Sequence, residues 1–143
     1  AVRLVHKNGN LQAAVGTTIL MQEQLPPFAT DDYQISAAGA SYKIGALTLG
    51  AVWENNRNAP FPLAPEGKAD FDAYGASAYY VDDSGAGIAL GFKEKNHDYD
   101  AADETVYTLK LEQRLTPGVK VWAETGQYDE AASNYAMGFN VTF

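Results

Sequence analysis

Charged side chains alternate with leucines in the segment 104–115. Lys110, Glu112 and Arg114 occupy every second position, and Leu109 and Leu111 stand among them. Successive side chains of an extended strand point to opposite faces, so the three charges would share one face. Because unpaired charges are costly to bury in a dry core, this face is expected to be wet. The chemistry that such a face offers is electrostatic, since ions and polar solutes can approach it.

Charges with the same spacing occur in other parts of the chain. We interpret the whole set as lining an aqueous lumen: Arg3, Lys43, Glu54, Lys93, Lys95, Lys110, Glu112, Arg114, Lys120 and Glu124. A second interpretation is that these charges are paired and only keep the interior hydrated. As a set, they predict a wet interior.

Nothing in the sequence points to catalysis or to a bound cofactor. His6 and His97 are far apart, and the lack of cysteine excludes thiolate nucleophiles, thiolate metal sites and disulfides. Patterns of a nucleophile elbow, a metal site or a phosphate-binding loop do not occur. The acidic segment 97–104 lacks the spacing of a calcium-binding EF-hand loop and is predicted to be a solvated loop. We therefore expect neither an enzyme nor a metal or cofactor site.

The overall charge and hydropathy narrow the class of protein. The net charge of -8 and the pI near 4.5 disfavour nucleic acid as a partner, because phosphate binding needs a basic surface. No stretch of about 18 apolar residues occurs, which excludes a transmembrane helix. The mean hydropathy of -0.27 is compatible with a transmembrane β-barrel, because only every second residue of its strands faces lipid.

Period-two alternation dominates the chain, and helical periodicity is nearly absent. It predicts nine strands, over residues 2–7, 10–22, 33–44, 46–56, 71–82, 85–96, 104–115, 118–128 and 134–143. The last strand has a large apolar face, formed by Tyr135, Met137, Phe139, Val141 and Phe143. Its other face is small and polar, and a membrane barrel would turn the large face outward. The predicted fold class is all-β, an antiparallel up-and-down transmembrane barrel or barrel segment over residues 1–143.

Aromatic residues on the large faces are predicted to lie at the two membrane interfaces, where amphipathic rings are favoured. They are Tyr42, Trp53, Tyr80, Phe92, Tyr107, Tyr135, Phe139 and Phe143. An alternative for some of them is packing against a neighbouring subunit.

Short turns and longer loops alternate along the chain. Short turns are predicted at 8–9, 44–45, 82–85 and 116–118, and longer loops at 23–32, 57–70, 97–103 and 129–132. In outer-membrane barrels the short turns face the periplasm and the longer loops the exterior, so the alternation assigns each strand end to one side. The proline-rich residues 58–65 are predicted to form a loop that folds over the barrel or contacts a neighbouring subunit.

Two C-terminal segments carry a family resemblance. Residues 134–143, which end on Phe143, resemble the closing strand of Gram-negative outer-membrane proteins. In residues 115–129, Thr116-Pro117 precedes a strand with an Ala123-Glu124 pair, and this segment resembles the penultimate hairpin of the trimeric general diffusion porins. Residues 38–42 and 72–80 are also similar to porin strands.

The resemblance implies a water-filled outer-membrane channel for passive diffusion of small hydrophilic solutes and ions, assembled as a homotrimer. It also implies that membrane lipid and lipopolysaccharide surround the barrel, and that the strand ending at Phe143 is read by the barrel assembly machinery. The family's constriction loop and the basic residues of its early strands have no counterpart in this sequence, so no constriction residue is assigned.

The odd number of strands bears on how much of a barrel is present. Bacterial single-chain barrels normally have an even number, so we expect the chain to be the C-terminal half of a barrel of about 16 strands. An alternative is a complete eight-stranded barrel over residues 10–143, with a structural or adhesive role and an interior filled by side chains. A soluble lipocalin-like barrel is a third alternative, which would leave Phe139, Val141 and Phe143 exposed without a reason.

Overall fold

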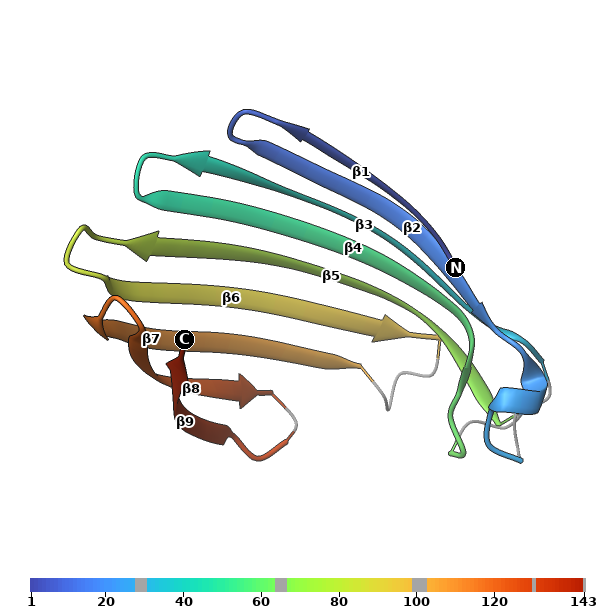
Figure 1. The fold of residues 1–143 in the computed structure, drawn as a ribbon. Coiled ribbons are helices and arrows are strands. Elements are labelled where there is room, and N and C mark those ends of the chain that lie inside the picture. Colours follow the sequence, from blue (N-terminus) through green and yellow to red (C-terminus); the bar gives the residue numbers. More distant parts are fainter. Residues whose placement is uncertain (28–30, 64–66, 99–102, 130, 143) are drawn as a thin grey trace.

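Nine β-strands in chain order form one curved antiparallel sheet (Figure 1). The computed structural model describes residues 1–27, 31–63, 67–98, 103–129 and 131–142. The strands are β1 (Val2–Asn8), β2 (Leu11–Leu20), β3 (Tyr33–Ile44), β4 (Leu47–Pro60), β5 (Lys68–Val81), β6 (Ala86–His97), β7 (Glu104–Thr116), β8 (Val119–Tyr128) and β9 (Asn134–Val141). A single turn of 3-10 helix, η1 (Gln22–Gln24), lies between β2 and β3. This up-and-down order confirms the predicted fold class.

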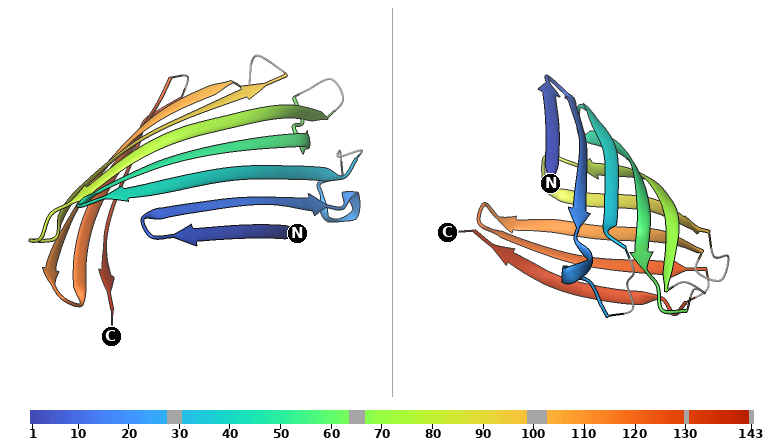
Figure 2. Two further views of the ribbon diagram at one scale, coloured as in Figure 1. Left: turned by 90° about the horizontal axis from the view of Figure 1, so that it is seen from above. Right: turned by 90° about the vertical axis from the view of Figure 1, so that its right-hand side faces the viewer.

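The sheet is an open arch. Viewed from above, its edge strands β1 and β9 lie far apart (Figure 2). A closed eight-stranded barrel would pair β9 with β2, but among the described strands β9 pairs with β8, and β2 pairs with β1 and β3. The eight-stranded alternative therefore does not describe this structure.

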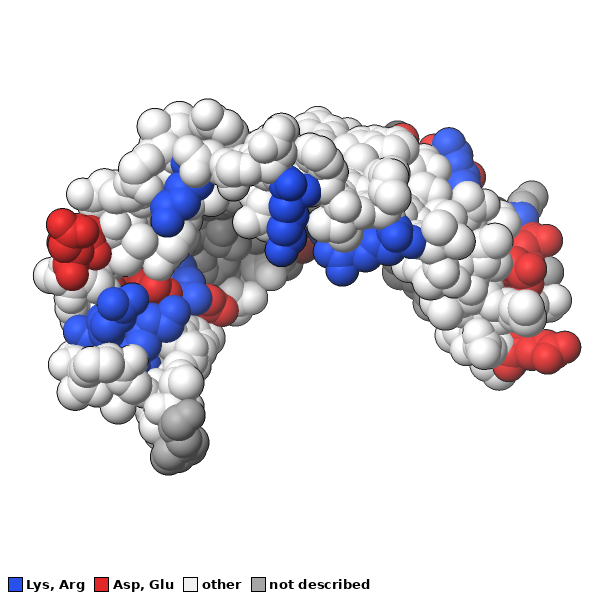
Figure 3. Space-filling view, turned by 45° about the horizontal axis from the view of Figure 1, so that its top comes forward, with Lys and Arg blue, Asp and Glu red and all other residues white. Residues whose placement is uncertain are grey.

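The register of the sheet assigns each strand residue to one of two faces. Leu4, Val15 and Ala38 lie opposite one another in a row that continues to Trp53 and Tyr74. We call the face that holds this row the outer face and the opposite one the inner face. Figure 3 shows Lys and Arg side chains along the hollow side of the arch, whereas the bulging side in view carries few charges.

The sheet has almost no core of its own. Among the described residues, the buried hydrophobic side chains are Ala59, Ala69 and Ala73, near the loop ends of β4 and β5. Large apolar side chains are instead exposed on the outer face, with Met137 at 84% and Phe139 at 73%. Such a sheet depends on its backbone hydrogen bonds and on an apolar surrounding for its outer face. No helix in the described part of the chain is long and apolar enough to cross a membrane.

The hairpin between β4 and β5 is longer than the sequence indicates. A loop was expected over 57–70, but β4 extends to Pro60 and β5 begins at Lys68. A bulge between Asn56 and Ala59 shifts the register, and Asn58 takes a left-handed φ of 57°. Proline is tolerated at a strand end, which the prediction of a loop overlooked. Beyond the bulge the hairpin bends sharply away from the line of the strands (Figure 1).

Candidate functional site

The inner face holds all ten charges that the sequence predicts to line a lumen. Arg3 is in register with Gly16, Ala37 and Glu54, and the same cross-strand row continues through Ala73 to Lys95 and Glu104. A second row brings Lys43, Lys110 and Glu124 onto this face, and Arg114 pairs with Lys120 near the turn end. Antiparallel pairing therefore gathers charges from seven strands onto one surface.

Small residues separate these charged rows. The central row of the inner face runs through Gly50, Ser77, Gly91 and Gly126. At the neighbouring Gly75, an added Cβ would lie 2.8 Å from the carbonyl oxygen of Phe92, so the backbone approaches too closely for a larger residue. Because these side chains project so little, the inner face is low along its middle and leaves space in front of it.

Glu112 is the most closely surrounded charge of the inner face. Its carboxylate accepts a hydrogen bond from Tyr79 Oη at 2.5 Å and one from Lys120 Nζ at 3.0 Å, and Lys110 Nζ lies 3.6 Å away. Lys110 Nζ also lies 5.5 Å from the ring centroid of Trp122. Sequence reasoning missed Tyr79 and Trp122, although both stand at period-two positions on the small, polar face.

Other wall charges are not matched by counter-ions. Arg3, Lys43, Lys93 and Arg114 make no ion pair with any residue in the described ranges. Lys95 Nζ lies 4.6 Å from the ring centroid of Phe71. The expectation of a face on which all charges are paired is therefore met only around Glu112.

A second polar cluster lies on the inner face near the loop end. Asn56 is fully buried; its Nδ2 donates to Glu54 Oε1 at 2.7 Å, and its Oδ1 accepts from Tyr33 Oη at 2.5 Å. Asp70 Oδ2 accepts from Arg57 Nη1 at 2.9 Å, and Asp70 Oδ1 accepts from the backbone N–H of Asn58 at 2.6 Å. These bonds fasten the bulged hairpin in its bent position.

His97 is buried, which corrects the prediction of a solvated loop from this residue onward. It is the last residue of β6, and its ring lies 4.6 Å from the ring of Phe71 and 5.7 Å from that of Phe61. Neither ring nitrogen has a hydrogen-bond partner. Residues 99–102 of the predicted loop lie outside the described ranges. No group of His, Cys, Asp and Glu suited to a metal ion is found in the described part of the chain.

The turn between β5 and β6 is organised by one carboxylate. Asp82 Oδ1 accepts a hydrogen bond from Ser84 Oγ at 2.6 Å and one from the backbone N–H of Ala86 at 3.0 Å. The hydrogen bond from Ser84 and then that from Ala86 hold the pKa of Asp82 below its usual range. The turn thus has a defined geometry at the end of the sheet opposite the long loops.

The predicted interface aromatics lie on the outer face, apart from Phe143, which is outside the described residues. The register places there Tyr42, Trp53, Tyr80, Phe92, Tyr107, Tyr135 and Phe139. Phe92 contacts two tyrosines, with ring centroids 6.4 Å from Tyr74 and 5.5 Å from Tyr107. Whether these rings mark the membrane interfaces stays a prediction.

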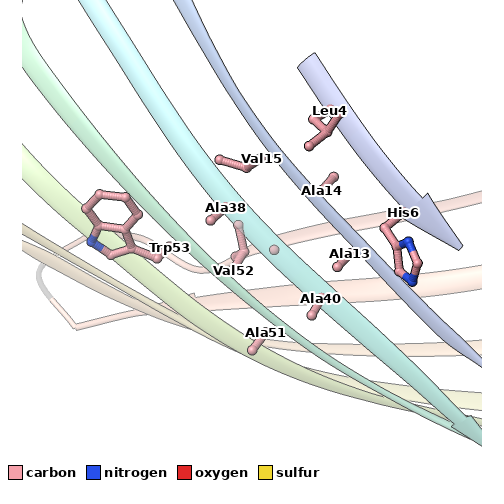
Figure 4. Close-up of a pocket in the computed structure, with 11 residues that line it drawn as sticks. Leu4, His6, Ala13, Ala14, Val15, Ala38, Ala40, Ala51, Val52 and Trp53 are labelled. Carbon is pink, nitrogen blue, oxygen red and sulfur yellow. The ribbon is translucent and has the colours of Figure 1, made fainter. Parts of the chain in front are cut away.

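The outer face is apolar but uneven. A shallow groove of about 560 Å³ crosses β1 to β4, and alanines such as Ala13, Ala38 and Ala51 form its floor (Figure 4). Leu4, Val15 and Trp53 also line it (Figure 4). The groove exists because these strands carry alanine at outer positions where β6, β7 and β9 carry leucine, tyrosine or phenylalanine.

Comparisons with known proteins agree with this two-faced sheet. The family model of Gram-negative porins matches residues 1–133. A porin whose structure was refined at 1.8 Å is 20% identical with a TM-score of 0.75; the match covers 99% of this chain and 50% of that one. A loop L8 deletion mutant of OmpT, an outer membrane protein of Vibrio cholerae, is 22% identical with a TM-score of 0.65, over 97% of this chain and 51% of that one.

The chain thus spans about half the length of the solved structures it matches. A search of curated proteins found no match. The solved structures support the fold, and the family model supports the kinship and the location in the bacterial outer membrane. The chain belongs to the Gram-negative porin family.

Proposed function

We propose that the protein conducts small hydrophilic solutes and ions passively through a water-filled channel. The observation that carries this proposal is the division of the sheet into an apolar outer face and an inner face of small and charged residues. In a bilayer the outer face meets lipid, and the charges of the inner face require water. A wall with both properties forms one side of an aqueous path.

The channel needs more strands than this chain provides. A spanning sheet must satisfy its backbone groups internally, and an open edge in lipid would leave them unpaired. Together with the coverage of about half of each matched structure, this supports a chain that forms the C-terminal half of a barrel of about 16 strands. Residues 1–143 then form one segment of a single barrel domain.

The ten inner-face charges act in this proposal as pore-lining residues, and the outer-face aromatics as interface anchors. No bound cofactor and no catalytic step are needed, because diffusion is driven by the concentration gradient alone. We propose the same for catalysis in general: the protein is a channel and not an enzyme.

The proposed partners follow from the resemblance and from the outer face. Membrane lipid and lipopolysaccharide would cover the apolar strands, and a homotrimer would cover part of them. The closing strand that ends at Phe143 would be recognised by the barrel assembly machinery. Light scattering of the detergent-purified protein tests the trimer, and a monomeric mass would contradict it.

The decisive experiment is single-channel recording of the intact, detergent-purified protein in planar bilayers. We expect stepwise, ohmic currents, together with swelling of proteoliposomes in small neutral sugars. An absence of both currents and swelling, with the barrel folded by circular dichroism, would contradict the channel. A structural or adhesive role would then be the better explanation.

A further inference from the structure

Basic side chains concentrate on the inner face, although the chain as a whole is acidic. Seven of the ten predicted wall charges are Lys or Arg, and three are Glu. The register adds Lys7 and Glu104 to the same face, so eight basic residues stand against four acidic ones. The chain carries ten Lys and Arg in total and a net charge of -8. Folding has therefore separated an inner face with a net positive charge from acidic strand ends.

The acidic residues outside the inner face lie toward the strand ends and loops. Asp31 pairs with Lys68 at 2.7 Å, and Asp70 pairs with Arg57 at 2.9 Å, both at the loop end. Lys68 and Arg57 are the two basic residues that are not on the inner face. At the opposite end, Asp82 belongs to a turn. The acidic excess therefore does not neutralise the wall.

The positive charge of the wall is also left available locally. Lys93 lies in register between Gly75 and Val106, and Lys43 lies opposite Thr48, so no carboxylate faces either lysine. Both are exposed, and neither makes an ion pair with another described residue. Lys110 and Lys120 share the single carboxylate of Glu112, which leaves that group with a positive charge.

We propose that this inner face makes the channel select small anions, such as chloride, phosphate and short carboxylates, over cations. The inference rests on the proposed channel function, because a wall selects only among ions that pass along it. A concave surface of one sign between low-dielectric walls concentrates its counter-ions. Fixed charges act over about 10 Å at 0.1 M salt, which is the scale of a narrow aqueous path.

The test is the reversal potential of the intact, bilayer-reconstituted protein in a potassium chloride gradient. We expect the sign that corresponds to chloride selectivity. In the double variant Lys43→Gln/Lys93→Gln the ratio of anion to cation permeability should fall roughly two-fold or more, because two unpaired positive charges are lost. The preference should also weaken at 1 M salt, where the screening length shrinks to about 3 Å.

A matched control separates the wall from the overall charge. Gln24→Glu/Gln127→Glu makes the same change in net charge, but Gln24 lies in η1 and Gln127 lies on the outer face. Its permeability ratio should stay close to that of the unmodified protein. An equal fall in both double variants would contradict the assignment to the inner face. If the lysine variant does not insert, Arg114→Gln with Lys43→Gln replaces it.

The outcomes for function and selectivity are distinct. If the folded protein shows no conductance, the proposed channel fails. If it shows ohmic conductance with a ratio at or below one, the channel stands and the anion selectivity is overturned. A lower swelling rate for proteoliposomes with small carboxylates than with neutral sugars of the same size would also overturn it.

Discussion

The outer and inner faces of this sheet share every backbone hydrogen bond but present opposite chemistry. Leu109 and Leu111 point outward from β7, and Thr108, Lys110 and Glu112 point inward from the same strand. The outer residues are exposed and have no polar partners to satisfy, whereas the inner ones form ion pairs or face water. The comparison teaches that each face is stable only in its own medium, lipid on one side and water on the other.

The comparison is broken most severely by a charge on the outer face. Leu109→Arg should destabilise the folded protein by about 2–4 kcal/mol if the residue lies near the bilayer midplane. The adjacent change Thr108→Arg, on the inner face, should cost far less. Urea-induced unfolding of both variants in phospholipid vesicles measures the difference. Equal losses would contradict the assignment of the faces.

On the inner face, the largest effect is expected at Glu112. Glu112→Ala removes the acceptor of Tyr79 and the counter-ion of Lys110 and Lys120, so it should cost about 2 kcal/mol. Glu124→Ala is the control, because Glu124 is exposed and makes no ion pair in the described part of the chain. The free energy of unfolding decides between them, and a larger loss for Glu124 would show that the cluster does not stabilise the wall.

His97 sharpens the comparison, because it is a dry position on the otherwise wet face. His97→Phe removes two buried nitrogens without partners and retains an aromatic ring beside Phe61 and Phe71. We expect the free energy of unfolding to rise by about 1 kcal/mol. His6→Phe, on the exposed outer part of β1, serves as the control in the same urea titration. A clear loss of stability in His97→Phe would mean that a ring nitrogen has a partner.

The smallest effect is expected at the turn, where the two faces end. Because the pKa of Asp82 is lowered by folding, its hydrogen bonds stabilise the turn fully above the ordinary Asp pKa of about 3.9. This stability is lost as the pH falls through the lowered pKa of the folded protein. Asp82→Ala should therefore flatten the pH dependence of the melting temperature below pH of about 4. The exposed neighbour Asp83, changed to Ala, is the control, and an equal flattening there would exclude the role of Asp82.

Much of the fold could be predicted because alternation is a local signal. The positions of Lys110, Glu112 and Arg114 in one strand are enough to place them on one face. The bond between Tyr79 and Glu112 could not be predicted in this way, since it joins β5 to β7 across β6 and depends on two registers. The burial of His97 depends on the bent β4–β5 hairpin, and the bulge at Asn56 has no clear sequence signal.

The sequence by itself determined the strands, their order and the two faces, because side-chain direction in a strand depends only on the parity of the residue number and neighbouring strands are joined by short turns. Only the tertiary structure decided which charges are paired, which lysines remain free on the wall and how far the arch opens. These properties depend on the register and curvature of strands that are not adjacent in the chain, and local patterns carry no information about either.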